Sequence, residues 1–598
     1  MSTYKINKAE EEPLGKEIDS KLLKRLLSYF KPYKWHIAIA TLLTIVISAL
    51  MAVRPRLNQI AIDDNILKDD IQGLQVIVLI LLATLILQGI IQYVMIYLTS
   101  WIGQKIIFDL RKKILDHVIN LNLKFFDKNP IGRLVTRVTN DVDVLYEVFS
   151  SGIVTAFGDV FMIIWILFFM FTLDINLSLV TLAVLPLLIY ATSVFRRKVR
   201  SSYRKIRVLL ARLNAYIQER ISGISIVQLF VKEKRTIDEF EVINRKHTEE
   251  NKKNIFYYAL FFPVIELLGA AAAGLIIWYG GGQVIQGMIQ VGVLISFIQF
   301  TEMFFRPLRA LSEKYNILQS AMASSERIFH LLDTKTLIND PQKPLTINNV
   351  KGRIDFKNVW FAYNHDDYVL RNVSFTINEG EKVAFVGATG AGKSTIINLL
   401  SRFYDVSEGE IMLDGIDIRK FKQKDLRKNI AIVLQDVFLF SGDIKSNIDL
   451  GNNAIDSDTL NNSVKNVGLN NFIESLPDKL YHKVNERGST LSVGQKQLIS
   501  FARALSFNPK ILILDEATSS VDTNTELLIQ NAIKKLIEGR TSIIIAHRLS
   551  TIQNCDKIIV MHKGELREMG THQELLEKNG LYYKLYQLQY EDELISKD

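Results

Sequence analysis

The sequence has 598 residues, of which 48% are hydrophobic and 23% charged, and its mean hydropathy is +0.14. This length exceeds one domain of about 100–200 residues, and the positive hydropathy predicts that part of the chain lies in lipid. The single cysteine, Cys555, excludes an intrachain disulfide and a cysteine-rich structural zinc site. The net charge of +9 leaves open whether the basic residues bind nucleic acid, lie at a membrane surface or do neither.

The N-terminal residues 1–20 are polar and charged, without the apolar segment of a signal peptide. In the next segment, Lys21–Trp35, the leucines and Phe30 share one helical face and the basic residues lie elsewhere. This pattern predicts an amphipathic helix at the membrane surface that leads into the first span.

Six long apolar stretches occupy the first half of the chain. Each is near or above the ~20 residues that cross ~30 Å of hydrocarbon, so we expect six spans. Six buried helices of a soluble protein would need an implausibly large core. The stretches are Trp35–Val53, Leu74–Trp101, Val148–Leu173, Ile175–Phe195, Phe256–Tyr279 and Ile289–Phe305.

Lysine and arginine concentrate in two loops, between Lys105 and Arg137 and between Arg196 and Lys253. The loops near Asp174 and at Gly280–Gly287 contain neither. Because cytoplasmic loops carry the basic excess, we expect both termini and both long loops in the cytoplasm of a multi-pass protein of the cell membrane.

The two long loops have helical patterns and short breaks. Ile106–Leu123 has apolar residues at helical spacing, so its helix should continue the second span beyond the bilayer. Asn129-Pro130 and Gly132 interrupt FFDKNPIGRL (Phe125–Leu134), and Ser222-Gly223 interrupts the second loop.

Few ionisable residues lie within the apolar stretches. Glu266 is in the fifth, and we expect it to be a buried carboxylate, either on the cargo pathway or as a structural hydrogen-bonding partner. Glu302 and Arg306 lie toward the end of the sixth, close to the inner interface.

The character of the chain changes near Pro341–Pro344, which is typical of a linker. Short strands are predicted at Ile354–Phe356, Val359–Phe361, Val373–Ile377 and Lys382–Val386. The last strand leads into GATGAGKST and then a helical stretch, which is the order that a phosphate-binding loop requires. The backbone N–H groups of the loop bind phosphates, Lys393 reaches the β- and γ-phosphates, and the Ser394 hydroxyl binds Mg²⁺. The loop residues are Gly387, Ala388, Thr389, Gly390, Ala391, Gly392, Lys393, Ser394 and Thr395.

A second apolar strand, Lys510–Glu516, ends in two carboxylates. Asp515 is placed to hold Mg²⁺, and Glu516 to orient or deprotonate the attacking water. A further strand, Thr541–Ala546, ends before His547. Strands that alternate with helices predict a parallel α/β core with its ligand at the carboxyl ends of the strands.

The sequence LSVGQ at Leu491–Gln495 resembles the LSGGQ signature of ATP-binding-cassette (ABC) proteins. Other motifs of that family are similar and stand in the same order: Tyr363 resembles the aromatic residue that stacks on adenine, Gln435 the Q-loop, Glu486–Gly488 the exporter-type X-loop, Ser519–Asp522 the D-loop and His547 the switch histidine. The motifs cover about residues 352–581, and the N-terminal half matches an ABC exporter by its six spans and long loops.

The resemblance implies an α-helical six-span membrane domain and an α/β P-loop nucleotide-binding domain that use ATP and Mg²⁺. It assigns phosphate binding to Lys393 and its loop, the arrangement of Mg²⁺ and water to Ser394, Asp515 and Gln435, catalysis to Glu516, and a γ-phosphate contact to His547. The expected domains are residues 1–34 (N-terminus and interfacial helix), 35–330 (membrane domain), 331–351 (linker) and 352–590 (ATP-binding cassette).

The chain contains one such motif set, so it resembles a half-transporter that needs a second chain. In the family, the signature of one chain completes the ATP site of the other; the corresponding residues here are Ser492, Val493, Gly494 and Gln495. Val493 replaces the middle glycine of the signature, which predicts a weakened half-site. We therefore favour a heterodimer with a different half-transporter over a homodimer.

The predicted function is ATP-driven export of hydrophobic or amphipathic compounds of the multidrug type. A lipid or lipopeptide exporter and an ATP-gated channel remain alternatives. Membrane lipid is an expected partner, and nucleic acid is not: residues 345–598 contain 31 Lys and Arg against 33 Asp and Glu, so the basic excess lies in the membrane half.

Overall fold

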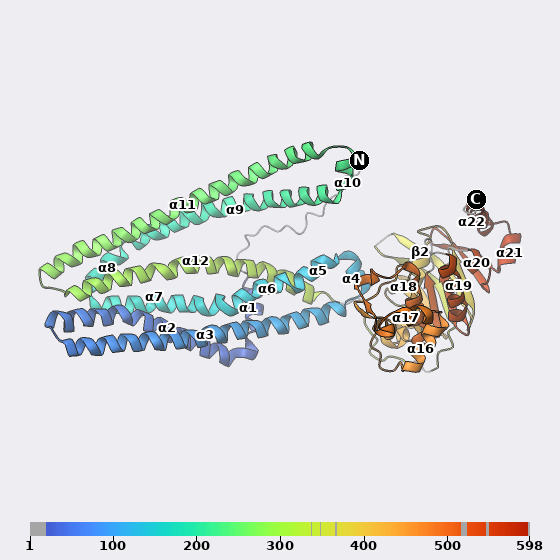
Figure 1. The fold of residues 1–598 in the computed structure, drawn as a ribbon, viewed down its shortest axis with the longest axis horizontal. Coiled ribbons are helices and arrows are strands. Elements are labelled where there is room, and N and C mark those ends of the chain that lie inside the picture. Colours follow the sequence, from blue (N-terminus) through green and yellow to red (C-terminus); the bar gives the residue numbers. More distant parts are fainter. Residues whose placement is uncertain are drawn as a thin grey trace. The chain divides into compact units, whose positions relative to one another are not determined.

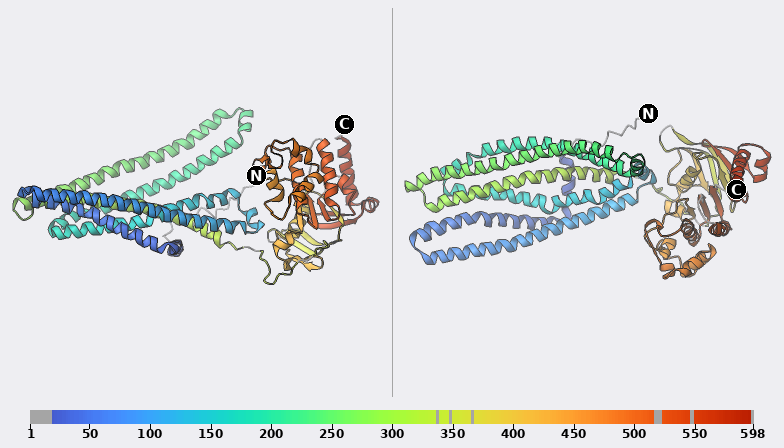
Figure 2. Two further views of the ribbon diagram at one scale, coloured as in Figure 1. Left: turned by 60° about the horizontal axis from the view of Figure 1, so that its bottom comes forward. Right: turned by 45° about the horizontal axis from the view of Figure 1, so that its top comes forward.

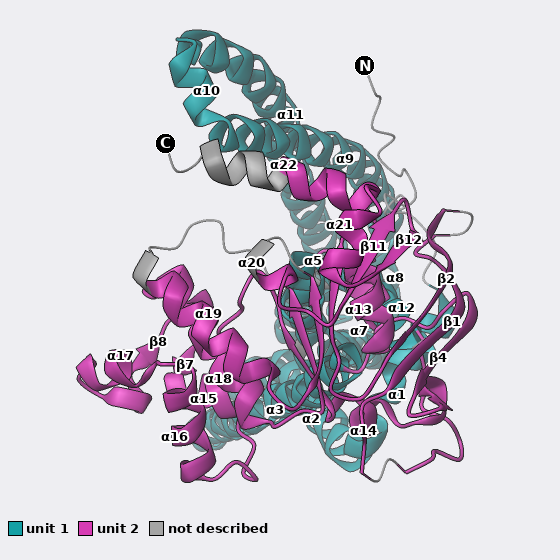
Figure 3. Cartoon of the chain, turned by 90° about the vertical axis from the view of Figure 1, so that its right-hand side faces the viewer, with its two compact units in different colours: residues 1–119, 131–334 teal, residues 120–130, 335–598 magenta. Residues whose placement is uncertain are grey.

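The computed structural model describes residues 19–335, 338–346, 349–364, 367–515, 523–545 and 549–595. The chain forms two compact units (Figure 3). Unit 1 contains Met1–Ile119 and Ile131–Thr334, and unit 2 contains Asn120–Pro130 and Lys335–Asp598. The short segment Asn120–Pro130 therefore packs with unit 2, although its neighbours along the chain belong to unit 1.

Unit 1 is helical. Its helices are α1 (Ser20–Ser28), α2 (Lys34–Ile60), α3 (Ile71–Ile119), α5 (Ile131–Val138), α6 (Asn140–Glu147), α7 (Ile153–Leu173), α8 (Ile175–Leu182), α9 (Leu185–Ser222), α10 (Ile224–Leu229), α11 (Glu233–Ile285) and α12 (Val291–Asp333) (Figure 1). The predicted interfacial helix is α1, and it ends several residues earlier than the sequence pattern indicates.

Among the described residues, five helical segments are long and apolar enough to cross a membrane. The sixth predicted span lies in the long helix α12 (Val291–Asp333), in which the apolar segment found among the described residues is Val291–Phe304. This segment is not one of the five candidates. The prediction of six spans is therefore not confirmed, whereas five of them are. The five segments are Lys31–Lys68, Ile71–Ile119, Ile131–Leu173, Ile175–Ser222 and Glu233–Ile285.

Several of these helices are much longer than a bilayer requires. Helix α3 has 49 residues and α11 has 53, so at ~1.5 Å per residue each exceeds 70 Å. Helices α9 and α11 pack along each other over much of their length (Figure 1). The predicted breaks at Asn129-Pro130 and Ser222-Gly223 are confirmed, because α4 (Leu123–Lys128) ends before Asn129 and α9 ends at Ser222. The predicted break at Gly132 is wrong, because Gly132 lies within α5.

Helices α2, α7 and α12 of unit 1 pack together (Figure 2). Aliphatic and aromatic side chains form the core between them. Phe297, Phe300 and Ile166 are fully buried there. At one end of this packing, the Asp63 carboxylate accepts a hydrogen bond from the backbone N–H of Gly292 at 2.7 Å and another from the Gln59 amide at 2.7 Å. Asp63 is 1% exposed, so these bonds satisfy a buried charge next to the N-terminus of α12.

Unit 2 is built on strands. They are β1 (Ile354–Ala362), β2 (Tyr368–Ile377), β3 (Lys382–Val386), β4 (Glu408–Leu413), β5 (Ile416–Asp417), β6 (Ile430–Val433), β7 (Gly442–Asp443), β8 (Lys483–Val484), β9 (Ile511–Asp515), β10 (Thr541–Ile545), β11 (Lys557–His562) and β12 (Glu565–Gly570). The predicted strands are present, and the first two of them form one strand, β1, which contains an irregularity between Phe356 and Val359.

The helices of unit 2 follow and connect these strands. They are α4, α13 (Lys393–Leu400), α14 (Gln423–Arg427), α15 (Ile444–Asp449), α16 (Ser457–Asn466), α17 (Asn470–Ser475), α18 (Val493–Ser506), α19 (Thr523–Ile537), α20 (Leu549–Ile552), α21 (His572–Glu577) and α22 (Leu581–Ile595).

The larger sheet has the strand order β12-β11-β3-β10-β9-β6, and all neighbours except β11 and β12 are parallel. Alternate residues point to opposite faces of a strand. Accordingly, Leu512 and Leu514 belong to one hydrophobic cluster, while Ile511 and Ile513 belong to the other. Both faces are covered, as expected for a parallel sheet.

Candidate functional site

The parallel strands of unit 2 bring the predicted site residues to one edge of the sheet. In the register, Asp515 at the end of β9 is opposite Ile545 at the end of β10, and Ile545 is opposite Phe385 on β3. Strand β6 lies on the other side of β9 and ends at Val433, two residues before Gln435. The phosphate loop, Asp515 and Gln435 therefore follow neighbouring strand ends.

The phosphate loop has the backbone that close approach to a ligand requires. Gly392 has φ +101°, and a Cβ there would lie 2.6 Å from Leu370 Cδ2. Gly387 has φ +153°, and a Cβ would lie 2.2 Å from the carbonyl oxygen of Met561 on β11. Both positions need glycine, because an added side chain would meet strain and a clash. The loop leads directly into α13, whose N-terminus attracts anions.

Lys393, the first residue of α13, is 8% exposed. Its ammonium donates hydrogen bonds to the carbonyl oxygens of Gly387 at 2.5 Å and Ala388 at 3.2 Å, so it folds back over the loop. Burial lowers the pKa of this ammonium, and the nearby Asp515 carboxylate opposes that shift. A buried cation at the centre of the loop is the group that a polyphosphate would pair with.

Two side-chain oxygen groups that could bind Mg²⁺ lie in this region. Ser394 is exposed at the start of α13, and Asp515 ends β9. The described residues contain no cluster of three or more acidic, histidine or cysteine side chains that could hold a metal. This donor set fits Mg²⁺, which binds to one or two protein oxygens and completes its shell with phosphates and water.

Three further predictions lie outside the described residues. They are the catalytic carboxylate Glu516, the histidine His547 and the D-loop residues Ser519–Asp522. By chain position, Glu516 directly follows Asp515, and His547 is two residues beyond the end of β10.

The Q-loop segment contacts the predicted X-loop. Gln435 is exposed, and four residues later the carbonyl oxygen of Leu439 accepts a hydrogen bond from the Arg487 N–H at 3.1 Å. Arg487 and Gly488 both have positive φ, so this turn is tight. Leu439 and Arg487 are far apart in the chain, and the sequence alone did not predict this contact.

Tyr363, the predicted adenine-stacking residue, lies beside the phosphate loop. Its hydroxyl is 3.2 Å from the Thr395 hydroxyl and accepts a hydrogen bond from the Asn398 amide at 3.3 Å. Its ring meets the edge of Tyr404, with 5.0 Å between the centroids. These contacts hold Tyr363 beside the phosphate loop, and its stacking on adenine stays a prediction.

Tyr404 and Asp127 are linked to this region by contacts that the sequence did not predict. The Tyr404 hydroxyl donates a hydrogen bond to the Asp127 carboxylate on α4, a residue 277 positions away. Burial and the adjacent carboxylate raise the pKa of Tyr404. Within unit 2, contacts therefore run from Asp127 through Tyr404 and Tyr363 to Thr395. The loop containing Asp127 was singled out from its sequence, but nothing in the pattern identified Tyr404 as its partner.

The signature residues begin helix α18. Ser492 is its N-cap and shares a capping box with Gln495, in which the Ser492 Oγ accepts from the Gln495 N–H at 3.2 Å and the Gln495 Oε1 accepts from the Ser492 N–H at 2.9 Å. Gly494 is buried, whereas Val493 is 58% exposed. The valine has no left-handed backbone, so the fold of this chain accommodates it, and it faces outward from α18.

Glu266 is exposed, whereas its position in an apolar stretch predicts burial. Its side chain is exposed on this chain and makes no hydrogen bond or ion pair with a described residue. The expectation of burial is wrong for the single chain, because the neighbouring Ile265 takes the inward-facing position on α11. A role in the cargo pathway stays a prediction.

Comparisons with known proteins agree with this geometry. Residues 37–308 match the model of the ABC transporter transmembrane region, and residues 370–519 match the ABC transporter model. The chain is 39% identical over 587 residues to an uncharacterized ABC transporter ATP-binding protein, YknV, of Bacillus subtilis, covering 97% of each chain. It is 37% identical to the ATP-dependent lipid A-core flippase of Syntrophus aciditrophicus, covering 96% of each chain. It is also 36% identical to the probable multidrug resistance ABC transporter ATP-binding/permease protein YheH of Bacillus subtilis, covering 87% of this chain and 77% of that one.

Proposed function

This chain belongs to the ABC transporter family, as an exporter half-transporter with its membrane region and its ATPase in one chain, and we propose that it exports hydrophobic or amphipathic compounds. It is an ATPase coupled to transport, and it is a multi-pass membrane protein with its nucleotide-binding domain in the cytoplasm. The observation that carries the proposal is the meeting of the phosphate loop, Asp515 and Gln435 at one sheet edge, in the same chain as five apolar spans.

In the proposed mechanism, the phosphate loop and Lys393 bind and orient the phosphates of ATP. Ser394, Asp515 and Gln435 would hold Mg²⁺, which would neutralise part of the phosphate charge. Glu516 orients the attacking water and accepts its proton, and His547 contacts the γ-phosphate. A second chain contributes its signature, so that ATP favours one conformation of the pair and hydrolysis releases it.

The cargo class is supported by composition and by two relatives. The spans are apolar, and side chains such as Phe168, Phe262 and Trp278 are more than half exposed on the single chain. One relative is named for multidrug resistance and another for flipping lipid A-core. A small amphipathic cargo is the first choice, and a lipid is the alternative.

Stimulation of ATP hydrolysis separates these two cargo classes. Purified transporter in nanodiscs should hydrolyse ATP faster when amphipathic dyes are added, because cargo favours the conformation from which hydrolysis proceeds. Stimulation by lipid A or a lipopeptide, with no response to dyes, would assign the lipid alternative. The absence of any response to either class would contradict the proposal.

Val493 is the evidence on whether this chain pairs with a second copy of itself or with a different half-transporter. Its exposed β-branched side chain projects from the N-terminal turn of α18, where a glycine would let the partner's nucleotide approach the backbone. We therefore infer a heterodimer, in which this chain supplies an intact phosphate loop and a weakened signature. Co-expression with a neighbouring half-transporter gene should restore full cargo-stimulated ATPase activity, and full activity of this chain alone would contradict the heterodimer.

A further inference from the structure

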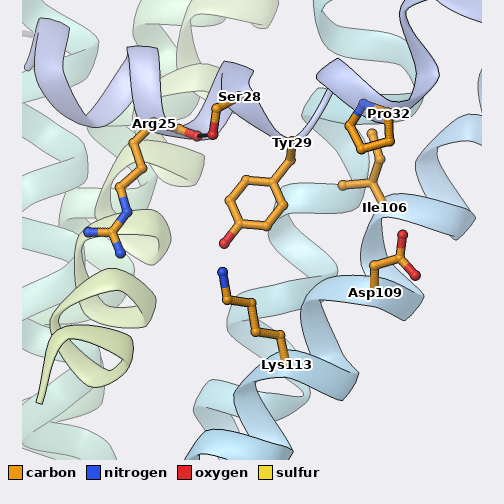
Figure 4. Close-up of a pocket in the computed structure, with 7 residues that line it drawn as sticks. All are labelled: Arg25, Ser28, Tyr29, Pro32, Ile106, Asp109 and Lys113. Carbon is orange, nitrogen blue, oxygen red and sulfur yellow. Dashed lines mark hydrogen bonds between the residues drawn. The ribbon is translucent and has the colours of Figure 1, made fainter. Parts of the chain in front are cut away.

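A pocket of about 340 Å³ lies between the interfacial helix α1 and helix α3 of unit 1 (Figure 4). We propose that it binds the phosphate of an anionic membrane lipid. Its lining includes Arg25 from α1, Tyr29 directly after the end of α1, and Ile106, Asp109 and Lys113 from α3. The volume is within the range of small-ligand pockets, about 300–1,000 Å³. The site is separate from the nucleotide-binding residues, all of which belong to unit 2.

Lys113 is the cation available to a ligand. Its ammonium is 5.7 Å from the centre of the Tyr29 ring, and the two side chains point toward one another (Figure 4). Lys113 is exposed and forms no ion pair with any described residue. A lysine next to a tyrosine hydroxyl offers an anion both charge and a hydrogen-bond donor.

Arg25 provides a second cation in a fixed orientation. Two of its N–H groups bind the carboxylate of Asp333 at 2.6 and 2.8 Å, and its guanidinium lies 4.3 Å from the centre of the Phe329 ring. The guanidinium has five N–H donors, and the others make no hydrogen bond with a described residue. Arg25 is therefore held in place by α12 while donors remain for a phosphate oxygen.

The one carboxylate in the lining, Asp109, is engaged elsewhere. It accepts a hydrogen bond from the Tyr33 hydroxyl at 2.8 Å, and it lies on the side of Pro32, away from Arg25 (Figure 4). The end of the pocket that contains Arg25, Tyr29 and Lys113 therefore has the positive character that a phosphate needs.

The surroundings favour a lipid over a soluble anion. Helix α1 buries Leu26 completely and exposes Lys21 and Lys24, as an interfacial helix does. Trp101, an aromatic residue typical of the membrane interface, precedes Ile106 by only ~7.5 Å along α3. Apolar Leu27 and Phe108 remain exposed on the two helices, so acyl chains have a surface to contact. Basic pockets between helices on the cytoplasmic side are typical sites for anionic headgroups.

Native mass spectrometry of the full-length chain in detergent micelles tests this proposal, with phosphatidylglycerol and phosphatidylcholine as probes. We expect tighter binding of phosphatidylglycerol, and in Lys113→Gln a dissociation constant about fivefold higher for that lipid, the effect of one lysine near an anionic surface. Phosphatidylcholine binding should change less, because the choline cation next to its phosphate offsets part of the attraction to Lys113.

Lys112→Gln is the matched control, since Lys112 is the adjacent exposed lysine and does not line the pocket. It should bind phosphatidylglycerol like the unmodified chain, and Tyr29→Phe should bind it more weakly. Equal affinities of the Lys112 and Lys113 variants, or equal binding of the two lipids, would overturn the proposal. Displacement of phosphatidylglycerol by a comparable concentration of inorganic phosphate would assign the pocket to a soluble anion and would also overturn it.

Discussion

Val493 is the residue on which the proposal of a heterodimer rests. Helix α18 begins normally, with the Ser492–Gln495 capping box intact, so the valine costs the fold of this chain little. Its side chain faces outward, and any penalty falls on the site that the helix helps to form in a partner. We therefore expect the valine to affect catalysis in the assembly rather than folding of the subunit.

Replacing Val493 by glycine should raise the ATPase activity of the chain expressed alone. Restored approach of the α18 N-terminus to phosphate should contribute about 1–2 kcal/mol, or roughly tenfold in rate. Steady-state phosphate release from the purified Val493→Gly variant measures this rate. Lys483→Gly is the control, because Lys483 is exposed on the surface. Val437→Gly would be unsuitable as a control, because Val437 packs against the core. An unchanged rate would mean that the valine is tolerated neutrally.

At the residue scale, the sequence predicted the phosphate loop well because its function needs a fixed order of strand, glycines, lysine and helix. Gly387 and Gly392 occupy the strained, crowded positions that the motif implies. Tyr404 could not be predicted in the same way. Its role arises from a hydrogen bond to a side chain 277 positions away, and no local pattern encodes such a pairing.

Helix α4 and its flanking residues form a short part of unit 2 that lies, along the chain, between two parts of unit 1. Segment Asn120–Pro130 belongs to unit 2, whereas the chain on either side belongs to unit 1. Asp127 on α4 contacts Tyr404, whose ring packs on Tyr363 beside the phosphate loop. A change at the nucleotide is thereby linked, through side chains in contact, to a segment that continues into α3 and α5.

Replacing Tyr404 by phenylalanine should uncouple this link. The ring packing on Tyr363 remains, but the hydrogen bond to the Asp127 carboxylate, about 1.5–3 kcal/mol for a charged acceptor, is lost. We expect unchanged ATP affinity and reduced stimulation of the ATPase by cargo, measured on purified protein in nanodiscs. Tyr481→Phe, an exposed tyrosine of the same unit, serves as the control. Full cargo stimulation in Tyr404→Phe would exclude the hydroxyl from coupling.

The buried Asp63 shows a second limit of sequence reasoning at the element scale. In the sequence, Asp63 is one of four aspartates between the first two apolar stretches, with Asp64, Asp69 and Asp70. This loop has few basic residues, which is typical of a loop outside the cytoplasm. In the structure, Asp63 caps the start of α12 through the Gly292 N–H. The spans were predictable because hydrophobic length is local, but a carboxylate that joins α12 to the end of α2 depends on tertiary packing.

Removing this carboxylate should destabilise unit 1. Asp63→Ala leaves the Gly292 N–H and the Gln59 amide without their acceptor in a buried site, at about 1–3 kcal/mol for an unsatisfied donor. The melting temperature of the detergent-solubilised protein should fall by several degrees. Asp64→Ala is the matched control, because Asp64 is adjacent, half exposed and paired only with Lys68 at the surface. Equal melting temperatures for the two variants would contradict a structural role for Asp63.

At the scale of the whole molecule, composition and charge were sufficient to identify a membrane half and a soluble half. The basic excess of the N-terminal half fits loops on the cytoplasmic side, and five of the six predicted spans are present among the described residues. What composition could not provide is the cargo, because apolar helices face lipid and hydrophobic compounds equally well.

The central claim is that ATP hydrolysis by this chain drives export. The most direct measurement is ATP-dependent accumulation of an amphipathic fluorescent dye in inside-out membrane vesicles that contain this chain and a co-expressed partner half-transporter, compared with the same vesicles carrying Glu516→Gln. We expect accumulation that requires ATP, together with retained ATP binding but no accumulation in the variant. Equal dye accumulation by Glu516→Gln, or accumulation without ATP, would contradict this claim.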